Sequence, residues 1–442
     1  KFKNQSDFLN ELKNWGFLIS DYNKVIKSID ELAMFHQQFE KKRFNLNYDI
    51  DGLVYKVNNL QLQKRLGFTS NAPRWAIAHK FSADHAYSEI LNIDIQVGRT
   101  GALTPVAKVK PVNIGGVVVS NATLHNEDEI IRKDIRIGDT VKIERAGDVI
   151  PHVLEVDIKK RDGNSKKFNF PKKCPCGFDT IKEFNKITKK YDAVRRCPDK
   201  GFECEKIAIE KIKHFISKEA LNIEGLGKKV VEKFWELNLI RKPQDIFSLK
   251  YDYIANLDGW GKLSVDNLRN SINKSKIVSL QRYIYSIGIR HIGIENAKII
   301  SENLKNTEHF LEIIRTKKFE KFLNIDGIGE TQISSLKNFF SNQVNVDIIS
   351  ELTSILNVKH QKSNKSGILV NKNFMFTGKL IGISRAEAKS LIEKNSGTTL
   401  SSMSKNLDYL VIGDKPTKHK VDQAKTLGIK VISQDELIKL LN

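Results

Sequence analysis

The chain contains four cysteines, all within one short segment: Cys174, Cys176, Cys197 and Cys204. Four thiolates suit a tetrahedral Zn²⁺, and glycines at 177 and 201 would allow the tight turns that carry such ligand pairs. Four ordinary free cysteines are the alternative, but this clustering is improbable by chance. One residue separates Cys174 from Cys176 where two are usual, which would strain the site or bring in another fourth ligand. The segment predicts a structural zinc site.

Four short turns form a second chemical pattern: Gly225-Leu226-Gly227, Gly259-Trp260-Gly261, His291-Ile292-Gly293 and Gly327-Ile328-Gly329. Their last glycines are 34, 32 and 36 residues apart (227 to 261, 261 to 293, 293 to 329). A Gly-x-Gly turn entering a helix points free backbone amides at a phosphate without reading a base. A single turn of this kind more often only ends a helix. A repeat of about 34 residues also occurs in helical solenoids, but their aromatic and proline signature is missing here.

We therefore interpret the four turns as helix-hairpin-helix units that bind the DNA backbone. The third turn has His291 in place of the first glycine, which puts its phosphate contact in question. The predicted contacts are Gly225, Gly227, Gly259, Gly261, Gly293, Gly327 and Gly329.

Two β-rich runs near the start of the chain each end near a lysine. They are residues 49–56, ending at Lys56, and residues 75–81, which contain Lys80. Alternation along a strand lets both lysines project into one cleft, and two cations there would suit the phosphates of a nucleotide. Each lysine alone is more often a solvated surface group.

The composition of the chain indicates which class of partner it binds. The chain has 442 residues, 40% of them hydrophobic and 28% charged, with a formal net charge of +21. This balance is globular, and the basic excess favours a polyanion, nucleic acid before a membrane surface, over a merely solvated basic surface. No apolar run is long enough to span a membrane, and the first residues lack the apolar core of a secretion signal. We expect a cytosolic protein with no membrane partner.

The segments that position these residues predict a multidomain α+β fold. Residues 90–156 have strand composition with glycine turns, which suits a small β-barrel. Residues 207–358 have helical periodicity. The last 76 residues alternate strands at 374–376, 409–412 and 430–432 with helices, of which the first is capped by Ser384 and Glu387 and the others cover 422–427 and 434–441.

The order of these segments resembles the NAD⁺-dependent DNA ligases of bacteria along essentially the whole chain. The two lysine runs look like the fourth and fifth nucleotidyltransferase motifs. Three further runs look like that family's OB-fold: residues 96–107, 119–126 and 145–151. The cysteines resemble its zinc finger, the four turns its helix-hairpin-helix domain, and the end of the chain its BRCT domain.

The resemblance implies the following domains: 1–83, the C-terminal part of a nucleotidyltransferase (adenylation) domain; 84–163, an OB-fold; 164–206, a four-cysteine zinc finger; 207–358, a helix-hairpin-helix domain; 359–366, a linker; and 367–442, a BRCT domain. It implies sealing of single-strand nicks in duplex DNA, independent of sequence, by a monomer in the bacterial cytosol that is associated with the nucleoid. NAD⁺ would donate AMP, and Mg²⁺ or Mn²⁺ would stabilise charge on the phosphates. Lys56, Lys80 and Arg43 would line the nucleotide pocket, and Arg99 and Arg145 would face DNA or the nucleotide.

Departures from the family pattern leave alternatives open. The family's nucleophile lies in a Lys-x-Asp-Gly motif, and no such motif occurs in residues 1–83, the part that resembles the nucleotidyltransferase domain. We expect the adenylated lysine to lie upstream, so that this chain is a C-terminal part that cannot adenylate itself. The alternative is a non-catalytic scaffold that binds nicked or intact duplex, and a BRCT-centred adaptor is more distant. The nucleotide-pocket lysines favour the ligase, because a scaffold does not need them.

Overall fold

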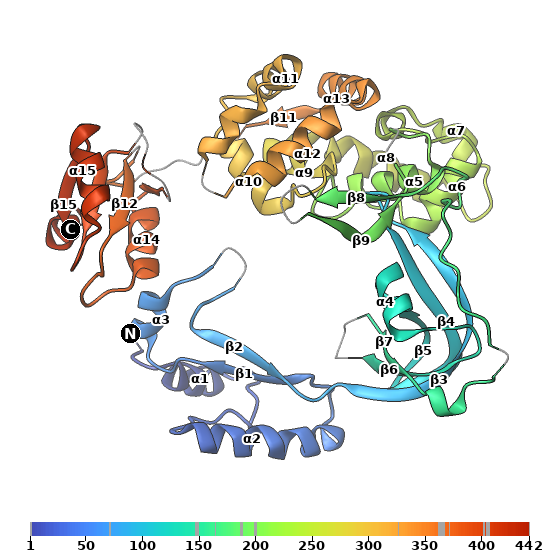
Figure 1. The fold of residues 1–442 in the computed structure, drawn as a ribbon, viewed down its shortest axis with the longest axis horizontal. Helices are drawn as coiled ribbons and strands as arrows, with labels where there is room; N and C mark the ends of the chain where they lie inside the picture. Colours follow the sequence, from blue (N-terminus) through green and yellow to red (C-terminus); the bar gives the residue numbers. More distant parts are fainter. Residues whose placement is uncertain are drawn as a thin grey trace. The chain divides into compact units, whose positions relative to one another are not determined.

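The computed structural model describes residues 2–69, 72–145, 150–163, 165–185, 189–198, 201–325, 327–360, 367–370, 372–400, 403 and 407–441. These residues form two compact units, Lys1–Ser82 with Ser363–Asn442 and, separately, Ala83–Lys362. The expected multidomain α+β fold is confirmed (Figure 1). Among the described residues, no helix is both long enough and apolar enough to span a membrane.

The first 82 residues combine short helices with one β-ribbon. The elements are α1 (Gln5–Asn14), α2 (Ile29–Lys42), the 3₁₀ helix η1 (Arg43–Asn45), β1 (Gly52–Lys56), α3 (Leu60–Leu66) and β2 (Ala76–Lys80). Ser28 is the N-cap of helix α2, and its hydroxyl accepts a hydrogen bond from the amide of Glu31. The helix buries His36 and Phe39. Strands β1 and β2 pair antiparallel, so the two β-rich runs do form one small sheet.

The β-patterned segment that follows forms a closed five-stranded barrel. Its elements are β3 (Asp84–Val97), β4 (Leu103–Ile114), β5 (Val117–Thr123), α4 (Glu127–Lys133), β6 (Thr140–Arg145) and β7 (His152–Val156), with strand order β3-β4-β5-β7-β6. Inward side chains such as Ile90, Ala107 and Ile143 are fully buried. The OB-fold expected from the sequence is this barrel. Part of one quoted run, residues 146–149, lies outside the described residues.

A small ribbon connects the barrel to the helical segment. After the 3₁₀ helix η2 (Ile158–Lys160), strands β8 (Ile181–Asn185) and β9 (Lys190–Arg196) pair antiparallel. The four cysteines lie around this ribbon, and Cys204 is the N-cap of the next helix, α5 (Glu205–Phe215).

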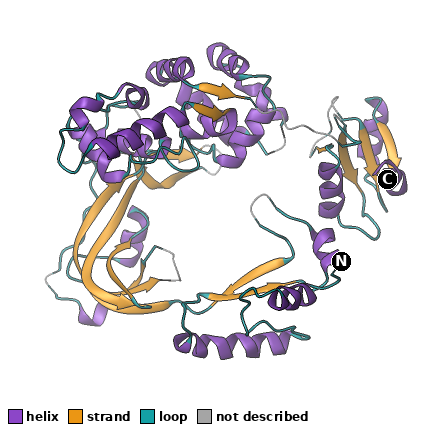
Figure 2. Cartoon of the chain, turned by 180° about the vertical axis from the view of Figure 1, so that it is seen from behind, coloured by secondary structure: helices purple, strands orange, loops and turns teal. Residues whose placement is uncertain are grey.

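The segment that follows is mainly helical (Figure 2). Its elements are α6 (Lys228–Glu236), η3 (Pro243–Ser248), α7 (Tyr251–Ile254), α8 (Lys262–Ser275), β10 (Ile277–Ser279), α9 (Leu280–Ser286), α10 (Ile294–Glu302), α11 (Thr307–Thr316), η4 (Phe319–Asn324), α12 (Glu330–Phe340), α13 (Gln343–Ile355) and β11 (Asn357–Lys359). One apolar core runs through these helices and buries Phe215, Phe234, Tyr283 and Phe310. Strands β10 and β11 pair parallel, so Lys359, expected in the linker, ends a strand; residues 361–366 lie outside the described part.

The C-terminal segment is a four-stranded parallel sheet with helices. It comprises β12 (Asn373–Thr377), α14 (Arg385–Lys394), β13 (Thr398–Thr399), β14 (Tyr409–Ile412), α15 (Lys418–Thr426), β15 (Lys430–Ser433) and α16 (Gln434–Leu441), with strand order β13-β12-β14-β15. The predicted capping box is present, since Ser384 Oγ accepts from the Glu387 amide and the Glu387 carboxylate accepts from the Ser384 amide. The second helix begins at Lys418, four residues before the predicted start.

Candidate nucleic-acid interface and metal site

The first residue of each glycine turn has a left-handed backbone. The φ angles are +91° at Gly225, +81° at Gly259 and +90° at Gly327, and His291 adopts the same conformation at +61°. A side chain in this region costs about 1–2 kcal/mol relative to glycine. The third turn therefore keeps the hairpin geometry despite its histidine, whose Nδ1 lies 2.9 Å from Ser335 Oγ.

The second glycine of each turn is the N-cap of a helix: Gly227 of α6, Gly261 of α8, Gly293 of α10 and Gly329 of α12. These four residues have ordinary extended conformations, with φ between −69° and −149°. A Cβ at Gly227, Gly261 or Gly293 would meet no described atom within 4 Å. The fold therefore does not require glycine there, and Ser, Asp or Asn would cap the helix better. Open access to the helix amides is a reason to keep glycine.

The four turns differ in charge and in the use of their amides. Helix α6 begins with Lys228 and Lys229 and has no acidic residue in its first turn. Helices α10 and α12 instead have Glu295 and Glu330 there. The Gly261 amide donates to Ser264 Oγ (2.9 Å) and the Gly329 amide to Gln332 Oε1 (3.1 Å). An anion is favoured most at the first turn, because its helix dipole is reinforced by lysines.

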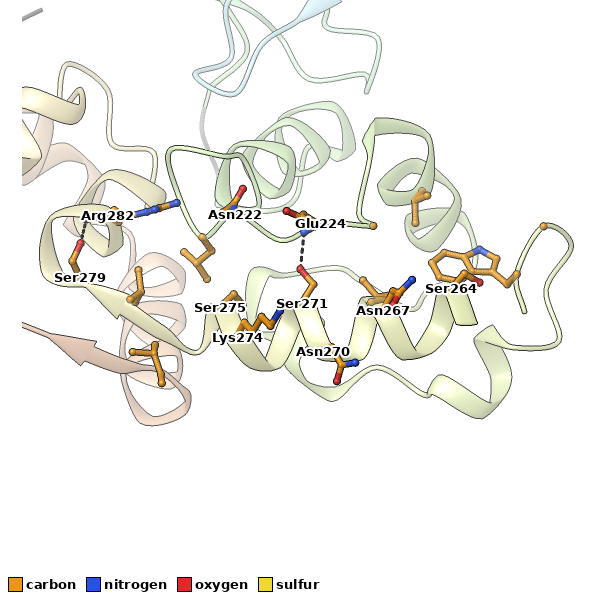
Figure 3. A pocket seen from close by; sticks show the side chains of 18 residues that line it. Asn222, Glu224, Ser264, Asn267, Asn270, Ser271, Lys274, Ser275, Ser279 and Arg282 are labelled. Carbon is orange, nitrogen blue, oxygen red and sulfur yellow. Dashed lines mark hydrogen bonds between the residues drawn. The ribbon is translucent and has the colours of Figure 1, made fainter. Parts of the chain in front are cut away.

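A polar groove of about 1010 Å³ runs between the first two turns, along α8 (Figure 3). Gly225 and Gly259 both line it, and Asn267, Ser271 and Lys274 point into it from α8. The Glu224 amide donates to Ser271 Oγ at 2.7 Å, which ties the first turn to the helix of the second. The two turns are thus held together as one surface.

All four cysteine sulfurs converge within 4.8 Å of one another and can hold one metal ion. The Sγ atoms of Cys174 and Cys204 are 3.9 Å apart, and those of Cys176 and Cys197 are 3.8 Å apart. A tetrahedral zinc with Zn–S bonds of about 2.3 Å would place its sulfurs about 3.8 Å apart. Burial raises the pKa of Cys174 to about 12, so this thiol needs a nearby cation to ionise.

The short spacing between the first two cysteines is accommodated by a closed turn. The Gly177 amide donates to the Cys174 carbonyl (2.7 Å), and the Cys174 amide to the Phe178 carbonyl (2.8 Å), while Gly177 has φ +92°. The cluster also contacts the barrel, because the Cys197 amide donates to the carbonyl of Gly101 in the β3–β4 loop (2.9 Å).

The two barrel arginines lie in different places. Arg99, in the β3–β4 loop, is half-buried and donates to Nδ1 of His214 on α5, whose Nε2 donates to the Tyr285 carbonyl at 2.8 Å. Arg145 is the last residue of β6 and pairs in register with Asp84. In this conformation Arg99 connects the barrel to the helices.

The two lysines of the N-terminal ribbon lie on one exposed face. Lys80 is opposite Gly52 and Lys56 opposite Ala76, so both lie on the same side, about 13 Å apart along the ribbon. Lys80 forms an ion pair with Asp51 (2.9 Å), and its hydrogen bond lowers the pKa of that carboxyl. Lys56 forms no ion pair with any described residue. The guanidinium of Arg43 stacks on Phe44 and Phe81, at 4.7 and 5.6 Å from the ring centres.

Matches to known domains account for most of this arrangement. Residues 1–84 match the NAD-dependent DNA ligase adenylation domain, and residues 87–165 match the NAD-dependent DNA ligase OB-fold domain. Residues 282–349 match the helix-hairpin-helix motif, and residues 364–441 the BRCT domain. The DNA ligase of Pelagibacter ubique is 62% identical over 442 residues, which is all of this chain.

The chain belongs to the NAD-dependent DNA ligase family.

Other relatives are more distant but equally extensive. The DNA ligase of Rickettsia bellii is 42% identical over 99% of the chain, and that of Wolbachia pipientis wMel is 43% identical over all of it. The chain spans 65%, 64% and 66% of the Pelagibacter, Rickettsia and Wolbachia proteins, just under two thirds of each.

Two features of this ligase-family chain were not predicted from the sequence. His214 has no sequence signal, since it lies in an amphipathic helix far from Arg99 in the chain. The first-turn charges that distinguish the hairpins were visible in the sequence, as Lys228 and Lys229 against Glu295 and Glu330, once each last glycine is taken as an N-cap.

Proposed function

We propose that this chain is part of a DNA ligase that seals single-strand nicks in duplex DNA with NAD⁺ as AMP donor, acting as a monomer in the bacterial cytosol. The observation that carries the proposal is the set of N-cap glycines that the fold does not need. Backbone amides at such helix ends bind phosphates of any sequence, as a nick-sealing enzyme requires. Family membership supplies the reaction class.

Nick sealing by a member of this family would proceed in three steps. A lysine nitrogen attacks the adenylyl phosphorus of NAD⁺ and nicotinamide mononucleotide leaves. The AMP then passes to the 5′-phosphate of the nick, and the 3′-hydroxyl attacks that phosphorus and expels AMP. Lys56 and Lys80, with Arg43 beside them, are the residues that we propose for the nucleotide phosphates. No Lys-x-Asp-Gly motif occurs in residues 1–84, which match the adenylation domain, so we assign no nucleophile there. The one such tetrapeptide in the chain, residues 160–163, lies within the match to the OB-fold domain and not in the nucleotide-binding part.

The phosphate contacts are proposed for the glycines of the four turns, with Arg99 and Arg145 as further DNA contacts. The spacing and burial of the sulfurs fit Zn²⁺, which Cys174, Cys176, Cys197 and Cys204 would hold as a closed structural site. The domain boundaries expected from the sequence belong to this proposal. So does Mg²⁺ or Mn²⁺, which would offset charge on the reacting phosphates.

The test is nick sealing by the product of the complete reading frame that contains this chain. A labelled nicked duplex, NAD⁺ and Mg²⁺ should give ligated product, and Lys80→Ala should reduce sealing at least tenfold. Lys110→Ala is the matched control, because Lys110 is also an exposed lysine on a strand and forms an ion pair, with Glu89 at 2.7 Å. Full sealing by Lys80→Ala would refute the assignment of this lysine, and no sealing by the unaltered protein would refute the function.

A second function, a non-catalytic duplex-binding scaffold, is favoured by one observation. The turns, the groove and the cysteine cluster all belong to the unit Ala83–Lys362, whereas the lysine ribbon belongs to the other unit. Binding that is unaffected by NAD⁺, by Lys80→Ala and by the upstream sequence, together with absence of sealing, would establish the scaffold instead.

A further inference from the structure

The β8–β9 ribbon exposes two aromatic rings next to each other. Phe184 is 51% exposed and Tyr191 is 68% exposed. The two residues are directly opposite in the register, and their ring centres are 5.2 Å apart at an interplanar angle of 65°. Such a pair stabilises a ribbon by itself, but that role does not require half or more of each ring to face water.

Ion pairs fix the position of this ribbon from both sides. On one face, Lys182 and Arg195 contact Glu127 of α4 in the barrel at 3.0 and 3.1 Å. On the other, Asp192 and Glu183 pair with Arg290, the residue just before the third hairpin turn. The rings are therefore carried on an element anchored to both the barrel and the helices.

The end of the ribbon that carries the rings is basic. From Phe184 to Tyr191 the sequence contains three lysines, Lys186, Lys189 and Lys190, and no acidic residue. Lys189 and Lys190 are exposed. Apolar rings flanked by cations complement a nucleic acid, which presents sugars and base faces between phosphates. An apolar protein surface would be complemented by the rings but not by this concentration of charge.

We propose that the β8–β9 ribbon is an additional duplex-DNA contact, in which Phe184 and Tyr191 pack against the sugars and base edges of a groove while Lys189 and Lys190 neutralise phosphates. The choice of DNA as the ligand rests on the function proposed above. The contact is separate from the hairpin turns, since it uses a strand pair and side chains in place of helix amides.

The experiment compares two double variants of the 442-residue chain by fluorescence anisotropy on a labelled nicked duplex, across a series of salt concentrations. Phe184→Ser with Tyr191→Ser should weaken binding about tenfold without changing the salt dependence, because no cation is lost. Lys189→Gln with Lys190→Gln should reduce the slope of log affinity against log salt by about 1.8, at about 0.9 per phosphate. Tyr87→Ser, on β3 of the barrel and 49% exposed, is the matched control and should bind as the unaltered chain does.

The outcomes separate this proposal from the function on which it rests. If the unaltered chain binds the duplex and both double variants bind within twofold of it, the ribbon contact is wrong and the function stands. If the unaltered chain does not bind at all, both fail. The lysine variant tests the contact even if the aromatic variant unfolds the ribbon, since both lysines are exposed. Loss of self-association in place of DNA binding would identify a second copy of the chain as the occupant and overturn the proposal.

Discussion

Serine at Gly227 should improve the fold and impair DNA binding. Gly227 has φ −69° and ψ 171°, the extended conformation of an N-cap, and a Cβ there meets no described atom within 4 Å. The new hydroxyl can accept a hydrogen bond from the amide of Val230, the third residue of α6. Serine is preferred to glycine at this position by a few tenths of a kcal/mol, so the melting temperature should stay the same or rise slightly.

The same hydroxyl occupies the position of a bound phosphate and takes one of the amides that would bind it. A hydrogen bond to a charged group contributes about 1.5–3 kcal/mol. Loss of one such contact corresponds to roughly 10- to 150-fold weaker binding. The salt dependence should not change, because no cation is removed, whereas Lys228→Gln should reduce the slope by about 0.9.

Gly293→Ser provides the internal comparison. Gly293 is also an open N-cap, but α10 has Glu295 in its first turn, which disfavours an anion. We expect at most a threefold loss of affinity there. The measurements are anisotropy binding to a nicked duplex and thermal unfolding of each variant. Unchanged affinity in Gly227→Ser would refute the phosphate role, and equal losses in the two variants would refute the ranking by charge.

Three further predictions follow from other parts of the chain. Elemental analysis should find one zinc per chain, lost with Cys204→Ser; a value near zero for the unaltered chain would exclude the zinc site. Burial lowers the pKa of His214 to about 4 from 6.5, so the folded state disfavours the protonated imidazole. About 3 kcal/mol of stability that is present above pH 6.5 should therefore be lost as the pH falls towards 4. The free energy of unfolding, measured with urea at several pH values, should depend less on pH in His214→Gln, and the same pH dependence in both proteins would contradict this. Ser396 has φ +65°, so Ser396→Gly should raise the stability of the BRCT domain by about 1 kcal/mol while Ser396→Ala does not, as judged by amide exchange.

The local features of the fold were predictable because short-range chemistry determines them. Glycine turns separated the helices, alternation marked the ribbon of Lys56 and Lys80, and the capping box of Ser384 and Glu387 located the start of α14. The convergence of the four cysteines followed from their clustering alone.

Other features depend on contacts between distant residues, and the sequence could not reveal them. The pairing of β10 with β11 joins three-residue strands about 80 positions apart. Helix α4 interrupts the barrel with only seven residues, too few for a clear periodicity, although Asn126 caps it. Arg99 meets His214 only because the β3–β4 loop packs beside the cysteine cluster. The placement of the candidate DNA arginines was therefore the least predictable part of the site.

The contact of that loop with the cysteine cluster has a thermodynamic consequence. A Cβ on Gly101 would lie 2.2 Å from the Cys197 carbonyl oxygen, so the loop and the cluster touch backbone to backbone. Barrel, ribbon and hairpins belong to one compact unit, Ala83–Lys362, and this contact restricts how far the loop and the cluster can separate. The relative freedom of the loop and the cluster is lost when the chain folds and not when a ligand arrives, which favours tight binding by a partner that touches both. Any entropy cost of ordering this junction is therefore included in the free energy of folding and does not reduce the affinity for a ligand.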